Sequence, residues 1–267
     1  MPQRHLTRCS QRPRFDPLRY EKIAFRNLGG SFVSESELSD IVEFSQVEIG
    51  SLVLDVGMGT GRVLRRLASK NPELVGVDAD SQMVRRFVTL MRATDARTQR
   101  DIHVVVASAE YLPFKDDLFG AVVCIRVLRY LDQPRIGISE MCRVLTPKGR
   151  IVLEFSNVFR PQSILQVPGY AIRGSCYPRL FTRRTIFKWL SKEGVRVGQL
   201  RGWHRVPVEL MGRLNGLFSV RILTHFDQVL QKIFPPELMS RSLVLSAVKT
   251  PLRVNDGLKS SQASLSG

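Results

Sequence analysis

The chain has 267 residues, 43% of them hydrophobic, which is enough for one well-filled α/β domain with added elements and excludes disorder of the whole chain. No run of about 18 apolar residues occurs, so we predict no membrane span. The four cysteines, Cys9, Cys124, Cys142 and Cys176, show neither zinc-site pairing nor the spacing of a disulfide framework. We therefore expect no metal and a reducing, cytoplasmic setting.

The formal net charge of +16 is concentrated towards the two ends of the chain. Residues 1–30 carry seven basic and two acidic side chains, and residues 157–267 carry seventeen and five. This distribution suits an anionic substrate, RNA or lipid headgroups, and it equally suits a basic surface with no dedicated partner. The Arg-rich start also resembles an organelle presequence, although three prolines interrupt a continuous amphipathic helix there.

Two helices are predicted before the first strand, after a basic arm over residues 1–18. A short helix, Tyr20–Leu28, is predicted to follow the arm and to end at Gly29-Gly30. Arm and helix together make up residues 1–30. A second helix would be capped by Ser34 or Ser36 and run to about Gln46.

From Ser51 onward, short apolar runs alternate with helical periodicity. The predicted strands are Ser51–Val56, Leu74–Val77, Ile102–Ala107, Gly120–Ile125, Arg150–Phe155, Val195–Leu200 and Leu243–Val248. The predicted helices between them are Thr60–Ser69, Ser81–Met91, Pro134–Val144 and Thr182–Ser191. This rhythm predicts a doubly wound α/β fold with a mostly parallel seven-stranded sheet that is covered on both faces.

Three segments do not follow this rhythm. Residues 157–181 contain several prolines and glycines and are predicted to be an insertion. Residues 204–242, before the last strand, have apolar side chains at helical spacing. They would be helices that cap the core, or a lid over an apolar substrate or a lipid-docking surface. The polar, small residues 251–267 predict a disordered tail.

The loop Asp55–Gly61 follows the first core strand and opens a helix, which is where doubly wound sheets bind ligands. Gly57 and Gly59 would let the backbone approach a ligand that any side chain would obstruct. Their Gly-x-Gly-x-Gly spacing disfavours a dinucleotide, whose fingerprint is Gly-x-Gly-x-x-Gly.

A second acidic residue, Asp78, ends the next predicted strand. A carboxylate there can accept both hydroxyls of a ribose. Asp78 could instead cap the following helix, as could Asp80 or Ser81. Loop and carboxylate together predict a site for an adenosine-type ligand.

Four segments in a row resemble motifs of the class I S-adenosylmethionine-dependent methyltransferases, in particular the group that acts in ubiquinone and menaquinone biosynthesis. They are Val53-Leu-Asp-Val-Gly-Met-Gly-Thr-Gly61, Gly76-Val-Asp-Ala-Asp-Ser-Gln-Met83, Ala109-Glu-Tyr-Leu-Pro-Phe-Lys-Asp-Asp-Leu-Phe119 and Ser139–Leu153. The resemblance covers about residues 50–156 and implies a methyltransferase domain over residues 31–250 that uses S-adenosyl-L-methionine.

The resemblance also implies roles for single residues. Gly57 and Gly59 would make room for the methionine part of the cofactor, and Asp55 would position its ammonium group. Asp78 would take the ribose hydroxyls and Ile125 would face the amino acid part. The adenine would lie near three residues: Met83, Ala109 through its backbone N–H, and Ser108, which stands where the family has Asp. The chain also has Gly120 for another Asp of the family, and Arg129-Tyr130 where relatives often have paired histidines.

Methyl transfer from a sulfonium has an activated leaving group, so a base is needed only if the acceptor must lose a proton. The candidate bases near the strand ends are Tyr130, Asp132, Glu154 and His204, each of which can equally be structural. Arg126 and Arg129 would hold an anionic acceptor or be two solvated side chains.

The segment Cys124-Ile-Arg-Val127 lacks the Asn/Asp-Pro-Pro-Tyr pattern of enzymes that methylate base amines. We therefore expect a small-molecule or lipid-like acceptor. The alternatives are a methyltransferase of tRNA or other RNA, which the basic termini would suit, and a non-catalytic cofactor-binding or assembly protein of the same fold. The sequence does not predict an oligomeric state.

Overall fold

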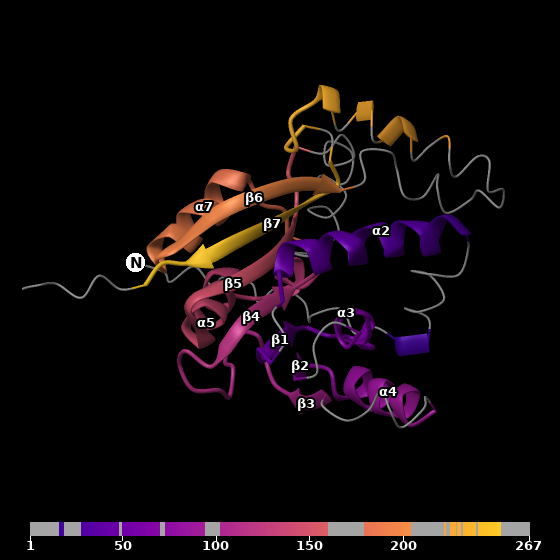
Figure 1. Ribbon diagram of the computed structural model, residues 1–267, viewed down its shortest axis with the longest axis vertical. Coiled ribbons are helices and arrows are strands. Elements are labelled where there is room, and N and C mark those ends of the chain that lie inside the picture. Colours follow the sequence, from indigo (N-terminus) through magenta and orange to yellow (C-terminus); the bar gives the residue numbers. More distant parts are fainter. Residues whose placement is uncertain are drawn as a thin grey trace, which may run out of the picture.

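The protein is described from a computed structural model, which covers residues 16–18, 28–47, 50–69, 73–93, 102–159, 179–203, 222, 225–227, 229–230, 232–238 and 240–251. Its centre is a seven-stranded sheet with the order β3-β2-β1-β4-β5-β7-β6 (Figure 1). The strands are β1 (Val53–Val56), β2 (Leu74–Asp78), β3 (Ile102–Val106), β4 (Phe119–Cys124), β5 (Leu145–Ser156), β6 (Val195–Trp203) and β7 (Ser242–Lys249). Strands β1 to β5 run parallel, and β7 runs antiparallel to β5 and β6. The predicted fold class is confirmed.

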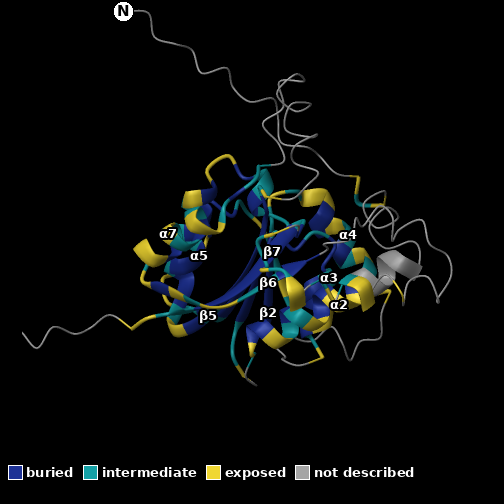
Figure 2. Ribbon diagram, turned by 90° about the horizontal axis from the view of Figure 1, so that it is seen from above, coloured by how far each residue is buried: buried dark blue, intermediate teal, exposed yellow. Residues whose placement is uncertain are grey.

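Helices cover both faces of this sheet. They are α2 (Leu28–Ser45), α3 (Arg62–Leu67), α4 (Ser81–Arg92), α5 (Pro134–Val144) and α7 (Arg183–Lys192), with a short 3-10 turn η2 (Leu128–Tyr130). Figure 2 shows α5 and α7 on one side of the sheet and α2, α3 and α4 on the other. Two hydrophobic clusters fill the corresponding interfaces, so each face of the sheet has its own core.

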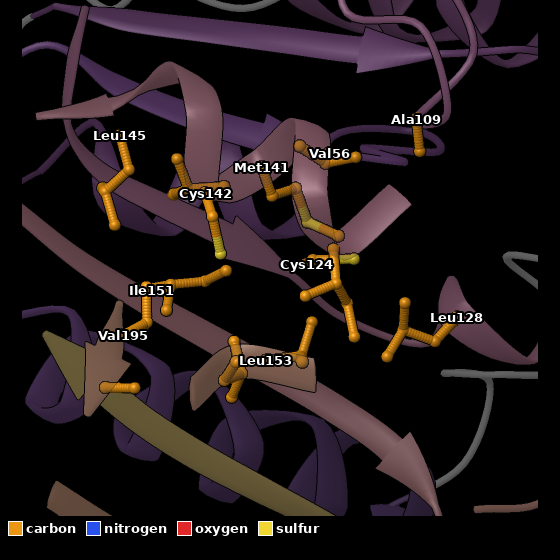
Figure 3. Close-up of a cluster of buried hydrophobic side chains, with 14 of the residues drawn as sticks. Val56, Ala109, Cys124, Leu128, Met141, Cys142, Leu145, Ile151, Leu153 and Val195 are labelled. Carbon is orange, nitrogen blue, oxygen red and sulfur yellow. The ribbon is translucent and has the colours of Figure 1, made fainter. Parts of the chain in front are cut away.

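The central strands are buried on both sides, as the apolar runs predict. Cys124 of β4 and Leu153 of β5 belong to the same cluster of buried side chains as Met141 and Cys142 of α5 (Figure 3). Both cysteines are free and buried, as expected of small core residues. Burial raises the pKa of the Cys142 thiol to about 12, so this thiol stays neutral and inert.

The predicted helix stop at Gly29-Gly30 is wrong. Helix α2 contains both glycines, and Ser34 and Ser36 lie inside it rather than at its start. Each glycine in a helix costs about 1 kcal/mol relative to alanine. The buried face of the helix includes Ile41 and Phe44, and this packing outweighs the local preference.

The other described elements agree with the prediction to within a few residues, except β5, which begins at Leu145 rather than Arg150. Parts of the prediction fall outside the described residues: most of the basic arm and of the helix Tyr20–Leu28, most of the insertion 157–181, residues 204–221 of the predicted cap and nearly all of the tail. Among the residues that are described, no helix is both long and apolar enough to cross a membrane.

Candidate functional site

A glycine loop leaves the carboxyl end of β1 and turns into α3. Gly57, Gly59 and Gly61 have φ values of +72°, +55° and +77°, in the left-handed region that glycine adopts without steric cost. The N–H groups of Gly57 and Met58 both donate to the carbonyl of Val77, at 2.7 and 3.0 Å. The loop is therefore anchored to the carboxyl end of β2.

The three glycines differ in what a side chain would meet. A Cβ on Gly57 would lie 2.2 Å from Cγ2 of Val127, and one on Gly61 would lie 2.1 Å from Cδ2 of Phe87. A Cβ on Gly59 would meet nothing within 4 Å. Gly57 and Gly61 thus allow the loop to pack against the protein, whereas Gly59 borders open space in which a ligand has room.

Asp55 lies beneath this loop and is 2% exposed. Its Oδ2 atom has no hydrogen-bond partner among the described residues. Burial, together with the nearby charge of Asp78, raises the pKa of Asp55 to about 7, and Arg62 partly opposes that rise. A buried carboxylate oxygen without a partner is costly, so this atom is suited to a cationic or hydrogen-bond-donating group of a ligand.

Asp78 ends β2 and holds the loop from the other side. Its Oδ2 accepts the Gly59 N–H at 2.8 Å and its Oδ1 accepts the Asp80 N–H at 2.8 Å. Desolvation by burial raises the pKa of Asp78. The cap of α4 is Asp80, which accepts the Gln82 N–H at 2.8 Å, so the alternative that Asp78 caps this helix is wrong.

The segment after β3 returns to the same edge of the sheet. The Ala107 N–H donates to the Asp78 carbonyl at 3.1 Å, and Ser108 Oγ accepts the Glu110 N–H at 3.2 Å. Ala109, Met83 and Ile125, which the resemblance assigned to the cofactor, are all buried. Of the predicted residues, Asp78 is linked directly to two others: it accepts the Gly59 N–H, and its charge contributes to the raised pKa of Asp55.

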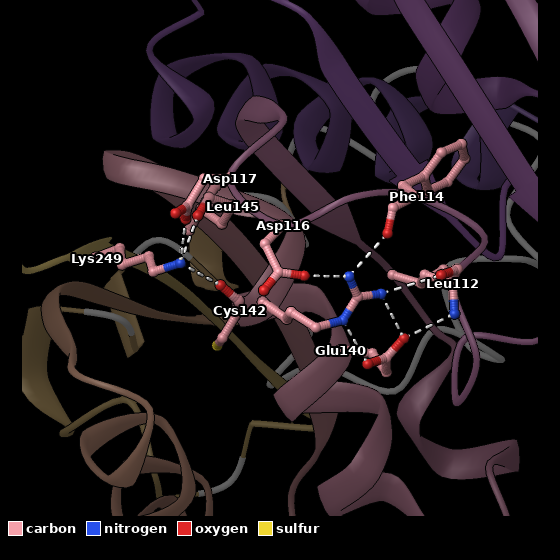
Figure 4. A network of polar contacts seen from close by, with 9 residues as sticks. Leu112, Phe114, Asp116, Asp117, Glu140, Cys142, Leu145 and Lys249 are labelled. Atoms are coloured by element: carbon pink, nitrogen blue, oxygen red, sulfur yellow. Dashed lines mark hydrogen bonds and ion pairs between the residues drawn. The ribbon is translucent and has the colours of Figure 1, made fainter.

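An arginine that sequence reasoning missed, Arg143, fixes the Ala109–Phe119 segment. Figure 4 labels its partners Leu112, Phe114, Asp116 and Glu140. Arg143 of α5 donates to the carbonyls of Leu112 and Phe114 at 3.0 and 2.8 Å and to Asp116 at 2.7 Å. It also pairs with Glu140, whose pKa it lowers and whose Oε2 accepts the Leu112 N–H at 2.9 Å. The i, i+3 spacing of Glu140 and Arg143 on a helix was the available signal.

The candidate bases are in different surroundings. Glu154 is 1% exposed, and its two oxygens accept hydrogen bonds from the Arg129 guanidinium at 2.5 Å and the Arg126 N–H at 2.9 Å. Tyr130 is half-buried in η2, and Asp132 is exposed. His204 lies outside the described residues. The structure thus places Glu154 in an ion pair with Arg129.

Arg126 and Arg129 are not the two solvated side chains that were one alternative. Arg129 pairs with Glu154, and Arg126 pairs with Glu37 of α2 at 2.5 Å, where the Glu37 side chain is 1% exposed. Buried protein carboxylates therefore already oppose both charges that were candidates for holding an anion. Glu37 carried no signal in the sequence, because its partner Arg126 is 89 positions away.

Comparison with known proteins shows what this part of the chain is similar to. Residues 54–153 match the family described as "Methyltransferase domain". The chain is 38% identical over 123 residues to the ubiquinone/menaquinone biosynthesis C-methyltransferase UbiE of Chromobacterium violaceum, covering 45% of this chain and 49% of that protein. It is 37% identical over 108 residues to the demethylmenaquinone methyltransferase of Clavibacter sepedonicus, covering 40% of this chain and 42% of that protein. The chain thus spans about half the length of the curated relatives it matches.

Solved structures agree with the fold over more of the chain. A methyltransferase from Bacillus halodurans, described as putative, superposes with a TM-score of 0.60 at 20% identity, covering 80% of this chain and 99% of that one. The magnesium protoporphyrin IX methyltransferase of Synechocystis, solved with bound SAH, superposes with a TM-score of 0.59 at 17% identity, covering 89% of each chain. Sequence motifs, sheet order and the match over residues 54–153 agree: this part of the chain is similar to the methyltransferase domains of the class I, S-adenosylmethionine-dependent type.

Proposed function

We propose that this protein transfers a methyl group from S-adenosylmethionine to a small quinone-like or lipid-like acceptor. The observation that carries the proposal is the arrangement of Asp55, Gly59 and Asp78 at one edge of the sheet, with an unpartnered buried oxygen on Asp55 and open space at Gly59. The quinone part of the proposal is supported by the relatives, whose names describe ubiquinone, menaquinone and demethylmenaquinone methyltransferases.

The residues present fit this cofactor. S-adenosylmethionine would supply a methyl group that its sulfonium already activates. Asp55 would take the ammonium of its amino acid part, and Ile125 would lie beside that part. Asp78 would take the ribose hydroxyls, because each carboxylate oxygen can accept more than the one backbone hydrogen bond it has here. Met83, Ser108 and Ala109 would bind the adenine.

The protein's own part in the reaction would be to bind, orient and exclude water. Glu154 is occupied by two arginine contacts and is not proposed as a base. Without Glu154 as a base, the site suits an acceptor that loses its proton readily without help.

Apolar side chains between β6 and β7 support a lipid-like rather than an RNA acceptor. Ile222, Phe226, Val229 and Ile233 are exposed to solvent in the described parts of residues 222–238. Their spacing of four, three and four positions is that of one helix face. Such a face suits contact with apolar molecules.

The proposal is tested by supplying methyl-labelled S-adenosylmethionine with separate lipid-quinone, polar-metabolite and RNA fractions. We expect label in the lipid-quinone fraction, and much less of it for a Gly59→Ala variant at cofactor concentrations near the wild-type dissociation constant. Label in RNA would identify the RNA enzyme that the basic charge would suit. Binding of the cofactor without any transfer would leave the non-catalytic alternative.

Asp78→Ala is expected to weaken S-adenosylmethionine binding by about 1–3 kcal/mol, the cost of hydrogen bonds lost from a charged group. The variant loses contact with the ribose and also the anchor of the Gly59 N–H. Asp80→Ala is the matched control, since it removes the α4 cap and should cost about 1 kcal/mol of stability without changing affinity. Calorimetric titration of both variants measures this, and equal affinities for both would contradict the assignment of Asp78.

The raised pKa of Asp55 predicts opposite effects of pH on stability and on binding. Its pKa is about 7 in the folded protein and 3.8 ordinarily, so the unfolded chain releases this proton first as the pH rises. The free energy of unfolding therefore falls as the pH rises from 3.8 to about 7, by roughly 4 kcal/mol at most. Affinity for the cationic cofactor should instead rise through about pH 7, because the ionised carboxylate binds the ammonium.

The comparison that checks this is between wild type and Asp55→Asn, by chemical denaturation and by calorimetry from about pH 5 to about pH 8. The wild type should lose unfolding free energy and gain cofactor affinity as the pH rises over this range. Both changes should be absent from Asp55→Asn, because it has no carboxyl group to ionise there. Parallel pH profiles for the two proteins would show that another group is responsible.

A further inference from the structure

A buried carboxylate on α2 holds one arginine from each side of the glycine loop. Oε2 of Glu37 accepts a hydrogen bond from Nη2 of Arg62 at 2.9 Å, and Oε1 accepts one from Nη2 of Arg126 at 2.5 Å. The Glu37 side chain is almost fully buried, and the side chains of Arg62 and Arg126 are 14% and 30% exposed. Because each oxygen takes a different arginine, the carboxylate fixes the two guanidinium groups relative to each other.

Arg62 belongs to the first wall of the site. It directly follows Gly61, the last residue of the loop, and is the first residue of α3. Its positive charge also acts on Asp55, where it opposes part of the rise in pKa that burial causes. A second contact, from Nη1 to Oγ of Ser34 at 2.9 Å, ties the same guanidinium to α2.

Arg126 belongs to the opposite wall, the segment that follows β4. Its φ of +64° is unusual for a residue with a side chain and costs about 1–3 kcal/mol, so it persists only where the surroundings hold it. Glu37 holds the Arg126 side chain, and Glu154 accepts its backbone N–H. The next residue, Val127, occupies the space that a Cβ on Gly57 would need.

We propose that Glu37 is a positioning residue of the cofactor site, which sets the spacing between the glycine loop and the segment after β4. The proposal rests on the proposed function. It makes α2 part of the site, although this helix lies outside the matched residues 54–153. Glu37 would act through Arg62 and Arg126 and touch no ligand itself.

Asp40 provides a matched control on the same helix. It accepts hydrogen bonds from the Arg201 guanidinium and, at 2.7 Å, from Nε1 of Trp203, so it anchors α2 to β6 rather than to the loop. Asp40→Asn therefore weakens the docking of α2 without touching either wall of the site. A general loss of helix docking would affect both variants alike.

The experiment measures the dissociation constant of S-adenosylmethionine by calorimetry and the melting temperature of each variant. We expect Glu37→Gln to weaken binding about tenfold or more, and Asp40→Asn to change it by less than about twofold for a similar loss of melting temperature. Glu37→Asp, which keeps the charge, should recover part of the affinity. Equal affinities for Glu37→Gln and Asp40→Asn would overturn the proposal.

A fallback variant and two wild-type controls keep this test decisive. If Glu37→Gln does not fold, Arg126→Met takes its place, because it leaves Glu37 paired with Arg62; the same loss of affinity is expected, and unchanged affinity overturns the proposal. Wild-type protein that binds no S-adenosylmethionine would overturn the proposed function and this inference with it. Wild-type binding together with an unaffected Glu37→Gln variant would overturn the inference alone.

Discussion

Gly59→Ala is expected to weaken S-adenosylmethionine binding by about 100-fold while leaving the domain folded. A Cβ at this position meets no protein atom within 4 Å and would enter the space proposed for the cofactor. The residue has φ +55°, so an alanine there also adds about 1–2 kcal/mol of backbone strain. The affinity loss is measured by calorimetry and the strain by chemical denaturation.

Gly194→Ala is the control that isolates the strain. Gly194 has φ +69° and open space around its Cβ position, but it lies in the turn between α7 and β6. We expect this variant to lose the same stability as Gly59→Ala and no affinity. If Gly59→Ala bound the cofactor as tightly as Gly194→Ala did, the ligand would not lie at Gly59.

Gly57→Val separates the two roles that the loop glycines have. Binding is expected to be abolished here as well, but with an additional loss of about 2–5 kcal/mol in the free energy of unfolding. The reason is that its Cβ would lie 2.2 Å from Val127, which must move together with the segment after β4. The sequence motif treats these two glycines as equivalent, and the packing around them does not.

The fold could be predicted because its signals are local. Strands β1 and β2 are short apolar runs with a carboxylate at or next to their last position, Asp55 in β1 and Asp78 in β2, and this pattern needs no knowledge of their neighbours. The start of α2 could not be predicted in this way. Gly29-Gly30 has the local signal of a helix end, and only packing of the helix on the sheet overrides it.

The residues of the candidate site also differ in whether a local sequence signal identifies them. Asp55, Gly59 and Asp78 come from contiguous motifs, so the sequence places them. Glu37 and Arg62 are 25 positions apart, and their roles come from ion pairs that exist only once the chain has folded. Arg126, Arg129 and Glu154 were recognised as charged residues near the site, but the pairing of Arg129 with Glu154 and of Arg126 with Glu37 was not. Motifs therefore indicate the residues that are proposed to touch the ligand, while the supporting contacts require the structure.

Glu154→Gln is expected to lower the free energy of unfolding by about 3–5 kcal/mol, because it leaves the nearly buried Arg129 guanidinium without its counter-charge. The glutamine can still accept the Arg126 N–H, so the loss reports the ion pair. Glu35→Gln, in the exposed pair with Arg66 at 3.9 Å, is the control and should change stability by less than about 1 kcal/mol.

A second substitution distinguishes a structural Glu154 from a catalytic one. Arg129→Met in the Glu154→Gln background should recover most of the lost stability, because removing both charges leaves no unpaired charge in the interior. A general base would behave differently: Glu154→Gln would then fold as stably as wild type, lose turnover, and lose the corresponding limb of the pH–rate profile. The stability of the single and double variants therefore decides whether this carboxylate holds the wall of the site or takes part in the reaction.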